Sequence, residues 1–110
     1  MARADVDATS ATERLASLDR LIHEPARLLI LSQLFVVKTA DFLFLLRQTG
    51  LTQGNLSSHM SKLESAGYVS VDKRFVDRKP RTLYALTRAG RTAFGRYVRD
   101  MKAVLADLPG

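Results

Sequence analysis

The chain has 110 residues, the size of one ordinary domain, and is 46% hydrophobic and 25% charged, as folded soluble proteins are. It contains no cysteine, which excludes disulfides, thiolate metal sites, cysteine nucleophiles and thiol redox sensing. Its apolar runs, such as Leu28–Leu31 and Leu34–Val37, are far shorter than the ~20 residues that span a bilayer. Residues 1–11 include Asp5 and Asp7 and have no apolar core, so they do not look like a secretory signal, and we expect a cytoplasmic protein without a membrane partner.

The net charge of +6 is located in the C-terminal part of the chain. Residues 1–67 hold seven basic and seven acidic residues, whereas residues 68–110 hold ten basic and four acidic ones. A localised basic surface suggests an anionic partner, either nucleic acid or a membrane surface. A solvated basic surface that keeps the protein soluble is the alternative, and charge by itself separates the two only weakly.

The N-terminal third predicts a tail followed by two helices. Residues 1–12 are small, polar and aperiodic, so we expect a flexible tail. From Glu13 the apolar residues Leu15, Leu18, Leu21 and Ile22 recur at spacings of three and four, which predicts a helix. Pro25 fits the first turn of a second helix, over about Glu24–Phe35. Because this segment is apolar on nearly every side, we expect a central core helix.

The middle of the chain predicts two short helices joined by a tight turn. Thr39 or Asp41 can cap the first, which ends at a left-handed Gly50 and buries Phe42, Leu43, Leu45 and Leu46. Thr52 can cap the second, which runs to Ala66, is ended by Gly67 and turns Leu56, Met60 and Leu63 inward. Two short helices around a glycine-containing turn are typical of a helix-turn-helix.

After Gly67 the apolar pattern changes to alternation, which predicts a β-hairpin. One strand is indicated by Tyr68, Val69, Val71, Phe75 and Val76, and the other by Leu83, Tyr84 and Leu86, around the polar turn Asp77–Pro80. Thr87 can then cap a last helix, over about Arg88–Leu108. The predicted fold is mainly α with a small β-hairpin, in the order α-α-α-α-β-β-α, and forms one domain over residues 13–108.

The helix from Thr52 to Ala66 has a polar outer face of short side chains. Gly54, Ser58, Ser61 and Ser65 form this face, and acid is nearly absent from it. Short donors and acceptors on a helix can lie against base edges and phosphates. The alternative, a solvent-facing helix, usually carries Glu–Lys pairs four residues apart, and this helix has none. We therefore predict nucleic-acid contacts from Thr52, Gln53, Gly54, Asn55, Ser57, Ser58, His59, Ser61 and Lys62.

The hairpin predicts a second part of the same interface. Only Asp72 and Asp77 oppose its cations, which are Lys73, Arg74, Arg78, Lys79 and Arg81. Protection of an edge strand by charge needs one or two lysines, whereas clustered arginine favours phosphate recognition. We expect these five residues to contact phosphates or a minor groove.

No catalytic or metal site emerges from the sequence. The two histidines are far apart: His23 lies at a helix junction, where capping fits, and a packing role or a phosphate contact both fit His59. Serine, histidine and carboxylate residues form no recognisable constellation, and there is no Gly-rich phosphate loop. We expect neither an enzyme nor a bound metal or cofactor.

Two segments together resemble a known family. Residues 51–69 (LTQGNLSSHMSKLESAGYV) are similar to the recognition helix and first wing strand of small MarR/ArsR-type winged-helix regulators, and residues 79–90 (KPRTLYALTRAG) to their second wing strand and the start of their last helix. The resemblance covers about Leu21–Leu108. It implies a dimeric transcriptional regulator whose terminal helices pair and whose wings flank one operator. Metal-sensing relatives use cysteine or histidine clusters and peroxide-sensing relatives use a reactive cysteine, and this chain has neither.

The last helix predicts how a dimer would form. Its apolar stripe continues to the end of the chain, and a stripe left in water usually marks an interface. The predicted dimer residues are Leu15, Leu18, Phe94, Tyr97, Val98, Met101, Val104, Leu105 and Leu108. In the alternative, the distal half of this helix packs on the N-terminal helix of the same chain.

The leading hypothesis is a sequence-specific, double-stranded DNA-binding regulator. As a two-fold dimer it would recognise an inverted-repeat operator. A winged-helix module that docks an acidic protein partner is the alternative. The sequence identifies no small-molecule effector.

Overall fold

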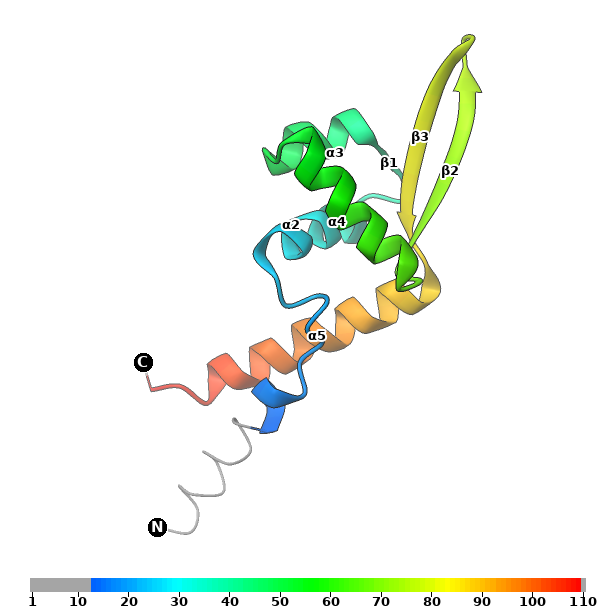
Figure 1. Ribbon diagram of the computed structural model, residues 1–110. Helices are drawn as coiled ribbons and strands as arrows, with labels where there is room; N and C mark the ends of the chain where they lie inside the picture. The colour runs from blue at the N-terminus through cyan, green and yellow to red at the C-terminus, as the bar shows by residue number, and fades with distance from the viewer. Residues whose placement is uncertain (1–12, 110) are drawn as a thin grey trace, which may run out of the picture.

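The computed structural model describes residues 13–109. It consists of helices and one small antiparallel sheet (Figure 1). In chain order the elements are α2 (Pro25–Val36), β1 (Ala40–Asp41), α3 (Phe42–Thr49), α4 (Gln53–Ser65), β2 (Val69–Val76), β3 (Lys79–Leu86) and α5 (Arg88–Ala106). This confirms a mainly α fold with a β-hairpin. Residues 1–12, predicted to be a tail, lie outside the described residues.

A side-chain oxygen caps the start of each of these helices, and three of the caps, Asp41, Thr52 and Thr87, are ones that the sequence predicted. Glu24 accepts hydrogen bonds from the N–H groups of the first turn of α2, which Pro25 opens. Asp41, Thr52 and Thr87 do the same for α3, α4 and α5. Each cap satisfies N–H groups that have no partner within their own helix. These local contacts fix the helix starts.

Two glycines end segments as predicted. Gly50 follows α3 with φ of 68°, and Gly67 follows α4 with φ of 78°. Both values lie in the left-handed region, which residues with a Cβ rarely adopt. The turn at Gly50 sets α3 against α4, and the turn at Gly67 directs the chain from α4 into β2.

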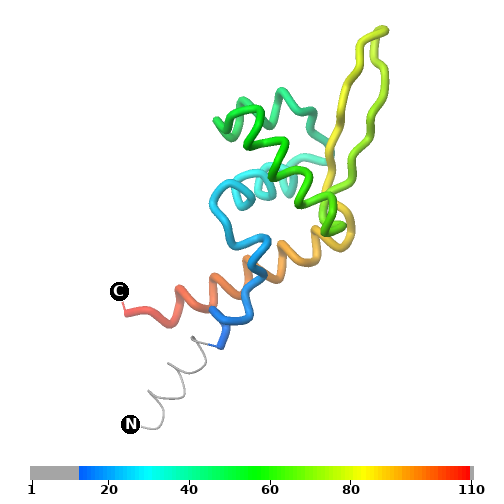
Figure 2. Tube along the Cα trace, in the orientation of Figure 1, coloured from blue at the N-terminus to red at the C-terminus, as the bar shows by residue number. Residues whose placement is uncertain are grey.

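The sheet has the order β1-β3-β2 and includes a strand that the sequence did not predict. β2 and β3 form a long hairpin, from Val69 opposite Leu86 to Val76 opposite Lys79. β1 adds only two residues beside β3, too few to produce an alternating pattern in the sequence. The hairpin projects away from the helices, and the C-terminal end of α5 lies at the opposite end of the molecule (Figures 1 and 2).

The core lies where α2, α3 and α4 meet, and α5 closes its lower side in Figure 1. From α2 it takes Ile30, Leu31 and Leu34. The other helices and the strands contribute Leu45, Leu56, Met60, Leu63, Val69, Tyr84, Phe94 and Tyr97. Within residues 13–109, no helix is both long and apolar enough to cross a membrane.

The prediction of a helix through Ile22 is wrong. Residues 13–16 are helical, but turns follow. The carboxylate of Asp19 accepts hydrogen bonds from the N–H groups of Leu21 (2.9 Å) and Ile22 (3.3 Å). These local bonds compete with the helical pattern, and the chain turns toward α2. Leu18 and Ile22 are buried all the same.

Three further expectations on burial and turns need correction. α2 is not buried on every side, since Phe35 and Val36 are exposed. Leu43, predicted to be buried in α3, is exposed as well. The turn of the hairpin is only Asp77–Arg78, because Pro80 already belongs to β3. Helical spacing shows which residues share a face, but other elements decide whether that face is covered.

Candidate nucleic-acid interface

The outer face of α4 is open over its first ten residues. Leu56, Met60 and Leu63 hold the helix on the core, so the opposite side chains face solvent. The exposed residues predicted to contact nucleic acid are Thr52, Gln53, Gly54, Asn55, Ser57, Ser58, Ser61 and Lys62. No acid stands in the first turn of this helix, where the helix dipole favours an anion. The structure places these residues on one accessible surface, and their contact with DNA stays a prediction.

His59 differs from the other predicted contacts because its ring turns inward. Its Nδ1 lies 3.1 Å from the guanidinium of Arg27 and 3.7 Å from a carboxylate oxygen of Glu24. The side chains of His59 and Arg27 are only 18% and 12% exposed. Arginine only donates, so the contact with Arg27 is a hydrogen bond in the tautomer whose Nδ1 accepts. His59 thereby links α4 to the first turn of α2.

The carboxylate of Glu24 organises this junction. Burial raises its pKa, but the N–H groups of Arg27 and Ala26 and the charges of His59 and Arg27 lower it by more in combination. The pKa of Glu24 is therefore below its ordinary value, and the carboxylate is charged at neutral pH. Arg27 also donates to the carbonyl oxygen of Leu21. Sequence spacing could not reveal this cluster, because its members lie on separate elements.

The hairpin carries its cations on exposed positions. Two of the five are close to an acid: Arg74 pairs with Asp72, and Arg81 lies 3.9 Å from Asp41. Among the described residues, the other three, Lys73, Arg78 and Lys79, form no salt bridge. From the pair Val71 and Tyr84, where its packing against the core ends, the hairpin extends about 20 Å further, at ~3.3 Å per residue. It therefore holds positive charge well away from the core (Figure 1).

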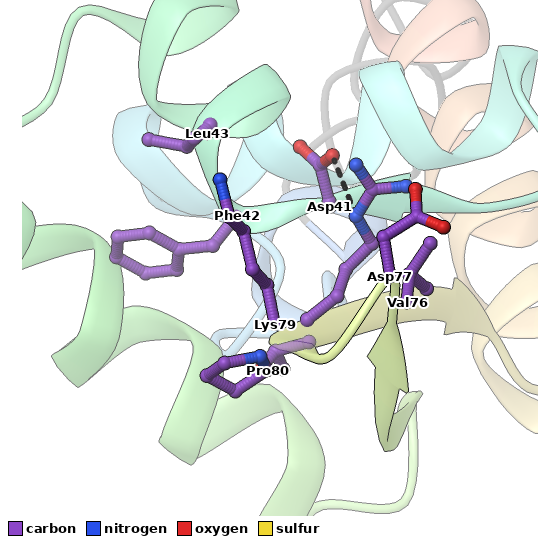
Figure 3. Close-up of a pocket in the computed structure, with 9 residues that line it drawn as sticks. Asp41, Phe42, Leu43, Val76, Asp77, Lys79 and Pro80 are labelled. Atoms are coloured by element: carbon purple, nitrogen blue, oxygen red, sulfur yellow. Dashed lines mark ion pairs between the residues drawn. The ribbon is translucent and has the colours of Figure 1, made fainter.

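A cleft of about 610 Å³ opens between the hairpin and the start of α3 (Figure 3). Phe42 and Leu43 lie on one side, and Val76, Lys79 and Pro80 on the other. Asp41 and Arg81 form an ion pair across it. The cleft exists because β1 pairs only with Leu83 and Tyr84, which leaves the outer edge of β3 uncovered. No local sequence pattern signals it.

The residues predicted to form a dimer fall into two groups. Leu18, Phe94, Tyr97 and Val104 are buried within this chain. Leu15, Leu105 and Leu108 are exposed, and Val98 and Met101 are partly buried. We call these last five residues the terminal apolar surface. Arg14 pairs with Asp107 at 2.9 Å, so residues 13–16 do lie beside the end of α5.

Polar contacts connect the segment before α2 to α5 and to Tyr68, which lies just before β2. The Tyr68 hydroxyl donates to Asp19 at 2.5 Å; this hydrogen bond, with burial and the charge of Asp19, raises the pKa of Tyr68 to about 12. His23 contacts the Tyr97 hydroxyl at 2.7 Å. The predicted capping role of His23 is wrong, since the neighbouring Glu24 caps α2.

Comparison with known proteins identifies the family. The family described as "Winged helix DNA-binding domain" matches residues 26–105. An uncharacterized protein of Methanocaldococcus jannaschii is 30% identical over 82 residues, which cover 74% of this chain and 89% of that protein.

Solved structures of transcriptional regulators show the same fold. A transcriptional regulator homologue from Pyrococcus horikoshii OT3 has a TM-score of 0.79 at 33% identity, over 89% of this chain and 95% of that one. A MarR-family putative transcriptional regulator from Porphyromonas gingivalis W83 has a TM-score of 0.63 at 20% identity, over 81% and 86%, and shares the fold. The resemblance seen in the sequence is confirmed. The chain belongs to the winged helix DNA-binding domain family of transcriptional regulators.

Proposed function

We propose that this regulator binds double-stranded DNA sequence-specifically as a homodimer. α4 lies in the major groove, and the β2–β3 hairpin, hereafter the wing (Val69–Leu86), lies on the backbone or in the minor groove. The observation that supports this most is the exposed, acid-free first half of α4 in a chain whose wing is basic. A major groove about 12 Å wide admits a helix of ~10–12 Å diameter.

The two parts of the interface have different tasks in this proposal. Side chains of α4 contact base edges and nearby phosphates, which provides sequence preference. Wing cations contact phosphates, which provides affinity that depends on salt but little on sequence. The residues assigned to α4 are Thr52, Gln53, Gly54, Asn55, Ser57, Ser58, Ser61 and Lys62, and those assigned to the wing are Lys73, Arg74, Arg78, Lys79 and Arg81. His59 is left out because its ring turns toward Arg27.

A single added charge tests the α4 assignment. Ser58→Glu places a carboxylate on the middle of the exposed face, where it would meet phosphates, and operator binding should be lost. The operator sequence is identified by selecting bound sequences from a random DNA pool. The affinity for this operator is then measured by fluorescence anisotropy. Thr92→Glu, on an exposed position of α5, adds the same charge and should bind as the unmodified protein does. A folded Ser58→Glu variant with unchanged affinity would refute the assignment.

The terminal apolar surface supports the dimer. Leu105 and Leu108 are each 59% exposed although they continue the stripe that buries Phe94 and Tyr97. Apolar area removed from water contributes ~25 cal/mol per Å², so a second copy of this surface is a favourable cover. Two copies related by a two-fold axis would present their α4 helices to half-sites roughly 34–36 Å apart, which predicts an inverted-repeat operator.

Leu105→Asp tests the dimer without disturbing the core. Since this side chain is already exposed, the monomer should stay folded while pairing is lost. Light scattering at micromolar concentration should give a dimer for the unmodified protein and for Thr92→Glu, and a monomer for Leu105→Asp. A monomeric mass for the unmodified protein that persists on addition of operator DNA would rule out the dimer.

A protein-docking module remains the competing function. It predicts no binding to random duplex DNA, whereas the DNA-binding proposal predicts binding that weakens steeply with salt. Titration of a random duplex at two salt concentrations distinguishes them.

A further inference from the structure

The wing carries an apolar pair that neither the fold nor the proposed phosphate contacts require. Phe75 is 77% exposed and is the most exposed aromatic residue in the described part of the chain. The register places Pro80, also exposed, directly opposite it. Cross-strand partners share one face of a hairpin, so the ring and the proline form one small apolar surface.

Hairpin stability alone does not account for this ring. The packed part of the wing ends at Val71 opposite Tyr84, and the β2 positions between Val71 and Phe75 are polar. Contact with Pro80 leaves most of the ring in water, as its exposure shows. A polar residue with high strand propensity, such as threonine, would suit this position equally well in the free protein.

The charges around the ring indicate what covers it. Lys73 shares the face of Phe75 on β2, and Arg78 and Lys79 lie at the nearby tip; none of the three forms a salt bridge among the described residues. The occupant is therefore a polyanion that also presents apolar groups. The sugar–phosphate backbone fits, because its phosphates alternate with the CH groups of deoxyribose.

The dimensions indicate which part of the duplex the ring meets. Phe75 stands two residues before the turn, about 7 Å from the tip at ~3.3 Å per residue. The minor groove is ~7.5 Å deep and ~6 Å wide, so it admits side chains of the tip but not a two-stranded ribbon with strands ~4.8 Å apart. With only the side chains of the tip in the groove, the ring lies at the outer part of its wall, beside the sugars.

We propose that Phe75, backed by Pro80, packs against deoxyribose at the wall of the minor groove, while Arg78 and Lys79 hold the adjacent phosphates. This proposal rests on the DNA-binding function above and deepens it. The contact of Phe75 with deoxyribose adds DNA affinity that does not depend on salt, because counterions are released only by the charged contacts.

Affinity measured over a range of salt tests the contact. Phe75→Thr should bind about tenfold more weakly for each wing in contact, equivalent to ~1.4 kcal/mol, with an unchanged salt slope. Phe75→Leu should retain most of the affinity. Lys79→Ala should instead lower the salt slope by ~0.9. Val36→Thr, at a position 82% exposed on α2, is the matched control and should change neither quantity.

Fluorescence separates DNA contact from hairpin stability. The chain has no tryptophan, so Phe75→Trp introduces a single reporter. On addition of duplex DNA its emission should move to shorter wavelength and become protected from acrylamide. Val36→Trp should show neither change. A ring that only stabilises the hairpin would stay equally accessible with and without DNA.

The outcomes distinguish this inference from the function on which it rests. If the unmodified protein binds DNA but Phe75→Thr binds equally well and Phe75→Trp stays quenchable, the sugar contact is wrong and the DNA-binding proposal stands. If Phe75→Thr lowers the salt slope, the variant acts through the neighbouring cations and the inference is again overturned. If the unmodified protein binds no duplex at all, the proposed function fails and the inference fails with it.

Discussion

The first turn of α5 packs so closely on the chain after α4 that it leaves no room for a side chain at Gly90. An ideal Cβ at this position would lie 2.8 Å from the carbonyl carbon and 2.9 Å from the Cα of Tyr68, and closer still to the carbonyl oxygen. These are backbone atoms, which cannot rotate away. The same carbonyl oxygen accepts a hydrogen bond of 3.0 Å from the N–H of Thr87, the cap of α5.

Gly90→Ala should therefore destabilise the protein despite the higher helix propensity of alanine. The propensity gain is ~1 kcal/mol. Against it, the backbones must separate, which costs about 1–3 kcal/mol as in other overpacked sites, and the Thr87–Tyr68 hydrogen bond weakens, at about 1 kcal/mol. The expected net loss is ~1–3 kcal/mol, and each kcal/mol lowers the Tm of a domain of this size by roughly 4–8 °C.

Gly95→Ala in the same helix is the matched control. No neighbouring atom lies within 4 Å of its ideal Cβ, so this variant should gain up to ~1 kcal/mol from propensity alone. Urea titration followed by circular dichroism gives both free energies of unfolding. Equal stability of the two alanine variants would refute the argument that close backbone approach at Gly90 fixes α5 beside α4.

Two further predictions concern the junction before α2. Because the folded-state pKa of Tyr68 is raised from 10 to about 12, its contribution to stability is complete below pH 10 and is lost as pH rises toward 12. Unfolding free energies over this interval should fall more steeply for the unmodified protein than for Tyr68→Phe, and parallel curves would contradict the hydrogen bond to Asp19. Arg27→Met leaves the Leu21 carbonyl and Glu24 without their guanidinium partner and should cost about 1–3 kcal/mol in urea unfolding. The exposed Arg20→Met is its control, and an equal loss in both would contradict a specific role for Arg27.

Elements with local signals could be predicted from the sequence. Thr52 and Gly67 bracket α4 because a cap and a left-handed stop act within a few residues of the helix ends. The apolar period then identified the buried face through Leu56, Met60 and Leu63, and so the exposed face opposite. Most of the candidate interface followed from these short-range rules.

Local signals were misleading where a side chain competed for the backbone. The apolar spacing through Ile22 is helical, yet Asp19 binds two backbone N–H groups and ends the helix early. Leu18 and Ile22 are nevertheless both buried. The path of the backbone between them depended on a hydrogen bond that periodicity does not report.

The tertiary structure alone decided what each exposed or buried side chain meets. His59 turns toward Arg27, thirty-two positions away in the chain, and β1 exists only because β3 lies beside it. α5 buries Phe94 but exposes Leu105, although both lie on one stripe. Burial and ion pairing depend on elements that are distant in sequence, so a pattern within one segment identifies the face that will be used but not its partner.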